Sequence, residues 1–269
     1  MLSPLYGQLS PLRVPTKAVR APVSDSDAEA YLVAVENADA MQLEQSVADA
    51  INSFVVGCKA DGIWTAIKAS CLLAGARTLS GALVPLVGTA PTNFNFVSGD
   101  YSRNTGLKGG TSKYLSSNRA GNSDPQNSKH IACYMSEHPT RDATRYAISN
   151  GAGSTQCNLY TSTIQRFSRI NSASSTVGVS DILTTTGFWG ASRAVSTSFL
   201  YRYEGATTSV TNNSTANPVG VFSIYSRDSN GASGFSNGRF SFYSIGQNLD
   251  LAALDTRVST LMTALAAAI

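Results

Sequence analysis

The feature that most constrains the fold is a succession of short segments rich in β-branched and aromatic residues between Arg77 and Ile245. They include "TRYAISN", "TQCNLYTS", "SFLYRYEG" and "GRFSFYSIG", and clusters of Gly, Asn, Ser and Pro separate them. Such segments are typical of strands, and the clusters between them of turns. About ten short strands without a long helix between them predict a mostly β chain, folded as an antiparallel sandwich of the jelly-roll type over residues 77–247.

The last of these segments shows the alternation expected of a strand. Successive side chains of a strand point to opposite faces. In "RFSFYS" this rule predicts Phe240 and Phe242 on one face, with Arg239, Ser241 and Tyr243 on the other.

Charge is sparse and unevenly distributed along the 269 residues. Only 14% of residues are charged and the formal net charge is +3, which is too small to indicate a nucleic-acid partner. Residues 96–247 nevertheless hold thirteen Lys or Arg and seven Asp or Glu, a net charge of +6. Solvated arginines are the simpler interpretation, and an anionic glycan or an acidic protein surface is the alternative.

Residues 1–24 carry four of the nine prolines and several large apolar side chains. Proline excludes helix here and favours extended backbone. The segment is read either as a disordered leader or, as we prefer, as an extended arm that anchors the chain on another subunit or protein. The arm would use Leu5, Tyr6, Leu9 and Leu12. It lacks the features of a signal peptide, and no apolar run is long enough to cross a membrane, so we expect synthesis and folding in the cytoplasm.

Residues 25–76 predict a helical subdomain. Ser and Asp residues precede the segment and acidic residues open it, as at a helix N-terminus. Apolar residues then recur at helical spacing through residue 58, and Asp61-Gly62 interrupts the pattern before "IWTAIKASCLLAG" resumes it. We expect two or three helices ending near Gly75, with Trp64 in the core.

Residues 248–269 predict a C-terminal helix capped by Asn248 or Asp250. Its apolar residues follow the 3-4-3-4 spacing of a helix-packing seam. They are Leu251, Leu254, Val258, Leu261 and Leu265. A helix so poor in charge must be covered. It docks either on its own sandwich or, the preferred alternative, against copies of the same chain.

The sequence offers little for catalysis or metal binding. The four cysteines form no CxxC pair and there are only two histidines, so we expect no zinc site, no other metal and no cofactor. Glycan hydrolysis needs two carboxylates beside the scissile bond, commonly on one strand. Between residues 96 and 247 no two acids lie within four residues of each other, so we expect no enzyme.

Binding of a carbohydrate would require exposed aromatic residues beside polar ones. The segments "GFWGASR" and "FLYRYEG" supply the candidates Trp189, Tyr201, Arg202 and Tyr203. Strand alternation places the two tyrosines on one face and the arginine on the other. The alternative, which we favour for the tyrosines, is that they pack in or over the core.

Three segments carry a family resemblance: "FVSGDYSRNTGLKGGTSKYLSSN" (96–118), "SKHIACYMSE" (128–137) and "GRFSFYSIGQNLDLAALDTRVSTLM" (238–262). They resemble the lectin-like jelly roll of the concanavalin/laminin-G type, in the version found in bacteriophage structural proteins. The helical preface also resembles segments that precede this module in phage tail and fibre proteins. The likeness extends over about residues 50–262.

The resemblance implies a virion component or a sugar-binding module, because this fold hosts several functions. We expect a non-enzymatic phage structural protein that projects its sandwich as a fibre or adhesin. A capsid decoration protein, a carbohydrate-binding module and, last, a glycan hydrolase are the alternatives. The implied partners are copies of the chain, with a trimer favoured, other virion proteins reached through residues 1–24, and a host surface glycan. The implied location is the virion.

Overall fold

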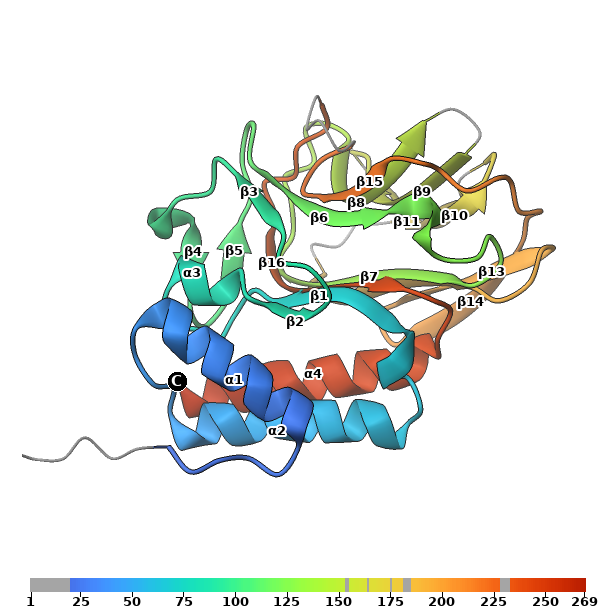
Figure 1. Ribbon diagram of the computed structural model, residues 1–269. Helices are drawn as coiled ribbons and strands as arrows, with labels where there is room; N and C mark the ends of the chain where they lie inside the picture. Colours follow the sequence, from blue (N-terminus) through green and yellow to red (C-terminus); the bar gives the residue numbers. More distant parts are fainter. Residues whose placement is uncertain (1–19, 153–154, 164, 175, 181–184, 228–232) are drawn as a thin grey trace, which may run out of the picture.

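A computed structural model describes residues 20–152, 155–163, 165–174, 176–180, 185–227 and 233–269. Two antiparallel sheets pack as a sandwich, and helices from both ends of the chain form a third layer on one of them (Figure 1). This arrangement confirms the predicted mostly β sandwich with helices before and after it. None of the described helices is long and apolar enough to cross a membrane.

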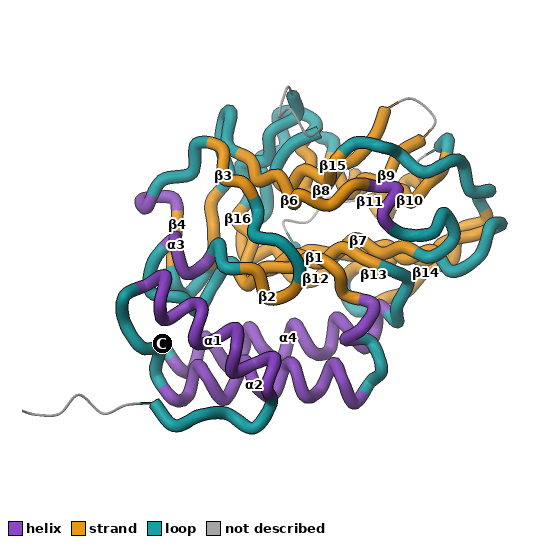
Figure 2. Tube along the Cα trace, in the orientation of Figure 1, coloured by secondary structure: helices purple, strands orange, loops and turns teal. Residues whose placement is uncertain are grey.

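Sheet A lies between the helices and the second sheet, sheet B (Figure 2). In spatial order sheet A contains β14 (Ala206–Thr211), β13 (Ser198–Tyr203), β12 (Gly187–Arg193), β7 (Lys129–Glu137), β16 (Arg239–Gly246), β1 (Ile67–Leu72) and β2 (Pro85–Val87), with β5 (Gly106–Lys108) beside β16 and β4 (Tyr101–Ser102) beside β5. Sheet B contains β11 (Thr176–Ser180), β10 (Gln165–Ser172), β9 (Thr155–Thr161), β8 (Arg145–Ala152), β15 (Val221–Ile224), β6 (Tyr114–Ala120) and β3 (Thr92–Phe94). The chain passes repeatedly from one sheet to the other, so segments distant in sequence become neighbours.

The helical layer consists of α1 (Ser26–Asp39), α2 (Gln45–Ala60) and α4 (Leu251–Ala268), with short elements α3 (Leu79–Ala82), η1 (Trp64–Ala66), η2 (Ser98–Asp100) and η3 (Gly121–Ser123) elsewhere. As predicted, carboxylates cap the helix starts. Asp25 accepts from two backbone N–H groups of α1, and Asp250 from two of α4. These bonds satisfy donors that a helix start otherwise leaves unpaired.

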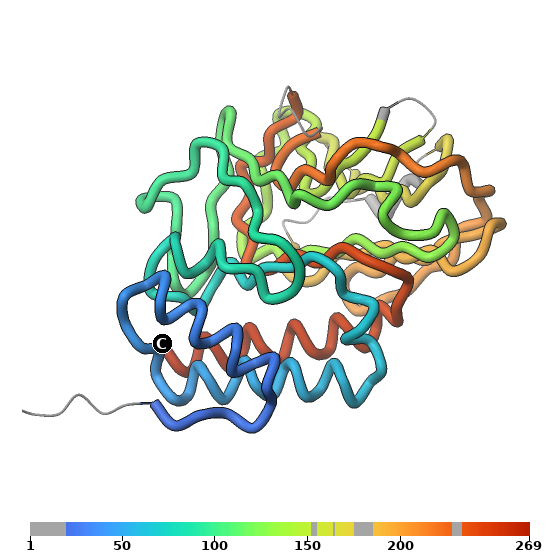
Figure 3. The backbone as a smooth tube through the Cα atoms, viewed as in Figure 1, coloured from blue at the N-terminus to red at the C-terminus, as the bar shows by residue number. Residues whose placement is uncertain are grey.

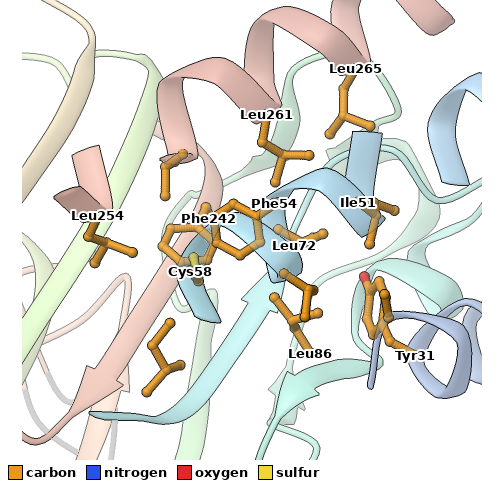
Figure 4. Packing of buried hydrophobic residues seen from close by; sticks show 14 of the residues in the cluster. Tyr31, Ile51, Phe54, Cys58, Leu72, Leu86, Phe242, Leu254, Leu261 and Leu265 are labelled. Atoms are coloured by element: carbon orange, nitrogen blue, oxygen red, sulfur yellow. The ribbon is translucent and has the colours of Figure 1, made fainter. Parts of the chain in front are cut away.

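Two hydrophobic cores result from this layering. One fills the space between the sheets, and the other lies between the outer face of sheet A and the helices. In the second core Phe54 of α2 meets Phe242 of β16 edge to face, with ring centroids 6.0 Å apart (Figure 4). Sheet A is therefore apolar on both faces, whereas sheet B has only one apolar face against the core.

The five apolar residues of α4 are all at most 2% exposed. They pack against α2 and the outer face of sheet A within the same chain. Figure 3 shows α4 running beside α2. This corrects the preferred expectation that Leu251, Leu254, Val258, Leu261 and Leu265 pack against another copy. The predicted interface residues of the arm, Leu5, Tyr6, Leu9 and Leu12, lie outside the described residues.

The predicted helix after Asp61 is wrong at residues 67–72, which form the strand β1 in the interior of sheet A. Ala69 and Cys71 point into the core between the sheets, while Ile67 and Leu72 point toward the helices. A strand buried on both faces shows no polar alternation, so its apolar run imitates a buried helix in the sequence. The sandwich thus begins before the expected boundary at Arg77.

The prediction that Phe240 and Phe242 lie on the same face of β16, opposite Tyr243, is also wrong. Phe240 and Tyr243 lie in the core between the sheets, whereas Phe242 lies in the helix-side core. The register of β16 against β7 shifts between Phe240 and Phe242. Such a bulge adds one residue and reverses the alternation of side chains beyond it. The rule that successive side chains alternate between the two faces therefore fails at Ser241.

Candidate functional site

The predicted sugar-binding aromatics lie in the core between the sheets. Trp189 is 1% exposed, and its indole N–H donates to Ser168 Oγ at 3.0 Å. Tyr201 and Tyr203 are also buried, and the guanidinium carbon of Arg166 lies 3.7 Å from the Tyr203 ring centroid. These aromatics pack against the protein itself. This corrects the assignment of Trp189 as a glycan contact and confirms the favoured alternative that Tyr201 and Tyr203 pack in the core.

Arg202 occupies the opposite face of β13, as strand alternation predicted. Its Nε lies 2.7 Å from Asp255 Oδ2 of α4, and both side chains are 13% exposed. The pair joins sheet A to the helical layer. Arg202 therefore has a structural partner on the side of the sandwich that the helices cover.

The outer face of sheet B, in contrast, is not covered by the helical layer (Figure 1). Three aromatic side chains cross it on neighbouring strands: Tyr146 of β8, Tyr160 of β9 and Phe167 of β10. Their ring centroids are 5.0 and 4.7 Å apart, with planes 25° and 5° from parallel. All three residues are partly exposed, and the ring of Tyr146 also packs against Gly234. We call this set the aromatic row.

Polar groups run beside the aromatic row. Asn158 of β9 pairs in register with Ser149 on one side and Arg169 on the other. Its Oδ1 accepts from Ser149 Oγ at 2.9 Å, and its Nδ2 donates to Gln156 Oε1 at 2.6 Å. These two hydrogen bonds fix the side-chain amides of Asn158 and Gln156. Gln156 and Arg169 are partly exposed at the surface. Rigid polar groups next to accessible rings are the combination that orients a polyhydroxylated ligand.

Among the described residues, the charged side chains near the aromatic row include Arg169 and Arg227. Burial lowers the pKa of Arg169, and burial raises the pKa of Tyr146 while the nearby Arg227 and Arg169 act to lower it. Guanidinium groups stay protonated throughout the neutral range and phenols stay neutral. The strands β8, β9 and β10 contain no Asp or Glu. The aromatic row is thus flanked by cations and by neutral hydrogen-bonding groups.

The described carboxylates of the sandwich have mostly structural partners. Asp100 pairs with Lys113, Asp124 with Arg119, and Glu137 with Lys108. Asp142 pairs with Arg145, whose guanidinium also bonds the Phe235 carbonyl, and Glu204 lies in the turn between β13 and β14. Each of these ion pairs joins one carboxylate to a different basic residue, so the pairs do not bring two carboxylates together at one ligand. Within the described ranges there is also no group of three His, Cys, Asp or Glu side chains placed to hold a metal ion.

Trp64, which the sequence placed in the core, is instead half-buried at the surface of the helical layer. Its indole N–H donates to Asp27 Oδ2 at 3.1 Å, and Lys59 Nζ lies 5.8 Å from its ring centroid. The ring borders a groove of about 560 Å³ between α1 and β2. The sequence reasoning thus exchanged the roles of the two tryptophans, and it missed the aromatic row although it recognised the strands that carry it.

No protein-family model matches this sequence, and neither does any curated protein. Among solved structures, a Trypanosoma rangeli sialidase in complex with 2,3-difluoro-KDN aligns with a TM-score of 0.53 and 11% identity, over 74% of this chain and 33% of the sialidase chain. A mutant of the same organism's sialidase displaying trans-sialidase activity aligns with a TM-score of 0.50 and 12% identity, over 80% of this chain and 39% of the other.

A botulinum neurotoxin serotype D binding domain aligns at a TM-score of 0.49 and 10% identity, over 72% of this chain and 51% of that domain. This chain spans only about a third to two fifths of the length of the sialidases. At identities this low, the two sialidase alignments show a shared β-sandwich fold and nothing about activity. None of the three proteins is a phage protein.

Proposed function

We propose that the chain is a non-catalytic carbohydrate-binding domain whose ligand meets the outer face of sheet B. The proposal depends on one observation, the accessible aromatic row of Tyr146, Tyr160 and Phe167 with Arg169 and Gln156 beside it. The rings offer apolar surface to the C–H faces of a sugar. The guanidinium and the amide offer hydrogen bonds to its hydroxyl or carboxylate groups.

The charge distribution favours an anionic glycan. Residues 96–247 carry a net charge of +6, and a guanidinium pairs with a carboxylate in two parallel hydrogen bonds. Two of the solved structures that share this fold are sialidases, so sialylated glycans belong among the first probes. We propose binding without hydrolysis, because the strands of this face contribute no carboxylate for acid–base catalysis.

Binding is tested on a glycan array, followed by titration calorimetry of the strongest anionic hit. Tyr160→Ala removes the central ring of the aromatic row and should weaken binding at least about tenfold, which corresponds to about 1.4 kcal/mol. Gln156→Ala probes the same face without removing a packed ring and should also weaken binding. Trp64→Ala removes a surface ring on the other side of the molecule and should leave affinity unchanged. An array without saturable binding, or equal losses in all three variants, contradicts the proposal.

The finer proposal, a structural role on a phage particle, depends on the resemblance of residues 96–118, 128–137 and 238–262. In this proposal residues 1–24 contact other virion proteins, copies of the chain form a trimer, and the sandwich projects as a fibre, adhesin or capsid decoration. The layering supports it, because the chain leaves residue 20 beside α1, on the side away from sheet B (Figure 1). Deleting residues 1–24 should abolish incorporation into particles while leaving a folded sandwich, and normal incorporation would contradict the anchoring role.

A further inference from the structure

The groove beside Trp64 has a volume of about 560 Å³, and its lining is mostly apolar. It lies between α1 on one side and the end of sheet A on the other (Figure 1). Its lining residues come from α1, η1, β1 and the β2 region. The α1 wall consists of Asp27, Ala30, Tyr31 and Ala34, of which the two alanines are exposed. The opposite wall includes the segment from Val84 to Val87. Such a groove has the form of a docking site for an extended apolar peptide.

The sheet side of this groove also offers backbone groups. In the order of the described strands β2 stands at one end of sheet A, with β1 as its neighbour. An end strand presents N–H and C=O groups on its outer side, to which another extended segment can bond. The aromatic ring of Trp64 stands beside this edge and suits proline, whose ring packs well on aromatic surfaces.

Residues 1–19 have the composition that this groove requires. The tetrapeptide Leu-Ser-Pro-Leu occurs twice, at residues 2–5 and 9–12. Proline excludes helix and favours an extended backbone, so each motif would present two leucines beside a proline. Residues 1–19 contain Arg13 and Lys17 and no acidic residue, whereas α1 contains four acidic residues and no Lys or Arg. Arg20, at the end of the segment, already pairs with Glu29 and Glu36 of this helix, and Lys59 pairs with Asp27.

Arg20 places the end of this segment beside α1, which forms one wall of the groove. Its guanidinium bonds Glu29 at 2.9 Å and Glu36 at 2.8 Å, and the side chain is 4% exposed. Val33, which is 44% exposed, lies on α1 between these carboxylates and the groove-lining Ala34. A helix with its side chains is about 10 Å across. About five extended residues, at roughly 3.3 Å each, therefore suffice to cross α1.

We propose that residues 1–13 bind in the groove of their own chain, with the two Leu-Ser-Pro-Leu motifs placed against Trp64 and the edge of β2. Residues 14–19 then cross the exposed side of α1 over Val33. The inference concerns the isolated chain and does not depend on glycan binding by sheet B. It assigns the leucines of the arm to an intramolecular contact in the isolated chain, which binding to other virion proteins would have to displace. The covalent link gives this contact a high effective concentration.

Limited trypsin digestion of the full-length protein tests this placement. Trypsin can cut after Arg13 and Lys17, and mass spectrometry of the released peptides 1–13 and 1–17 follows those cuts alone. The double variant Ala30→Arg/Ala34→Arg fills the groove from two exposed helix positions. It should release these peptides at least about tenfold faster than the unchanged chain, because cleavage follows the open population. The matched control Ala266→Arg, at an exposed position of α4, should cut at the unchanged rate.

A second variant perturbs the segment itself. Leu5→Asp/Leu12→Asp should cause the same acceleration and should shift the emission of Trp64 to longer wavelength, since the ring loses its cover. Trp189 is buried and serves as the constant background. Equal cutting rates in the unchanged chain and both double variants would overturn the proposal. Protection that rises with protein concentration, together with a dimer mass by light scattering, would also overturn it by placing the segment on a second copy.

Discussion

His130 provides the sharpest test of the packing between the sandwich and its final segment. The ring lies on β7 and is fully buried. Its Nε2 is 2.7 Å from Ser244 Oγ of β16, and its Nδ1 is 2.5 Å from the carbonyl oxygen of Gln247, just before α4. A neutral imidazole satisfies both contacts by donating from Nδ1 and accepting at Nε2. The ring therefore holds the turn into α4 against sheet A.

Burial lowers the pKa of His130 to about 4 from its usual 6.5. The hydrogen bond to the Gln247 carbonyl and the charge of Asp124 oppose this effect, and Arg119 adds to it. Because the folded-state pKa lies below the unfolded one, the contribution of His130 to stability is complete above pH 6.5. It is lost as pH falls from 6.5 toward 4, since the unfolded chain then binds the proton first. The difference of 2.5 pKa units predicts a loss of about 3 kcal/mol.

Urea denaturation at a series of pH values between 7.5 and 4 measures this loss. The reference is His130→Gln, which keeps a donor and an acceptor but does not titrate. The variant is expected to be less stable at pH 7.5, and its free energy of unfolding should fall by about 3 kcal/mol less than that of the unchanged chain down to pH 4. Titration of the remaining groups is common to both proteins and cancels. Parallel curves for the two proteins would refute the reasoning.

Three further predictions concern side chains that connect different secondary-structure elements. Leu254→Ala should lower the free energy of unfolding by about 2–5 kcal/mol in urea, because this α4 side chain is completely buried, and a loss near zero would mean that the helix is not docked. Arg193→Lys should lower the melting temperature clearly, because one ammonium cannot replace a buried guanidinium that bonds five backbone carbonyls. A double-mutant cycle on Arg202 and Asp255 should give a coupling of about 1 kcal/mol that decreases in high salt, and a salt-independent value near zero would contradict the pairing.

Local patterns predicted the elements whose faces differ in polarity. The α2 helix has one buried face, on which Val47, Ile51 and Phe54 recur at helical spacing, and this contrast made the helix readable in the sequence. The cap of α4 at Asp250 is equally local, since it needs only a carboxylate followed by two backbone N–H groups. These features depend on neighbours in sequence, so the sequence was sufficient.

The errors arose where tertiary contacts decide the outcome. Both faces of β1 are buried, one by sheet B and one by the helices, and the contrast that distinguishes strand from helix disappears. The bulge near Ser241 in β16 follows from its pairing with β7, which lies more than 100 residues earlier. Whether α4 packs on its own chain or on a copy depends on the free surface of α2 and sheet A, which no local pattern reports.

The same limit explains why the sequence analysis selected aromatic residues that the structure buries. Trp189 and Tyr203 were selected for their type, yet they pack on Arg166 in the space between the sheets. Tyr146 and Tyr160 were read as ordinary strand residues, because a row across strands exists only once the register is known. A single ring in the sequence is ambiguous, and cross-strand pairing gives it a neighbour.

The asymmetry of the two outer faces supports the proposal that a ligand binds to sheet B. The outer face of sheet A carries Phe188 and Phe242, which would be costly to leave in water, and the helices bury them. The outer face of sheet B alternates rings with Asn158, Arg169 and Ser149, whose polar groups are bonded across strands or reach solvent. A third layer there would have to desolvate these polar groups. Sheet B is therefore suited to a ligand that brings its own hydrogen-bonding groups and negative charge.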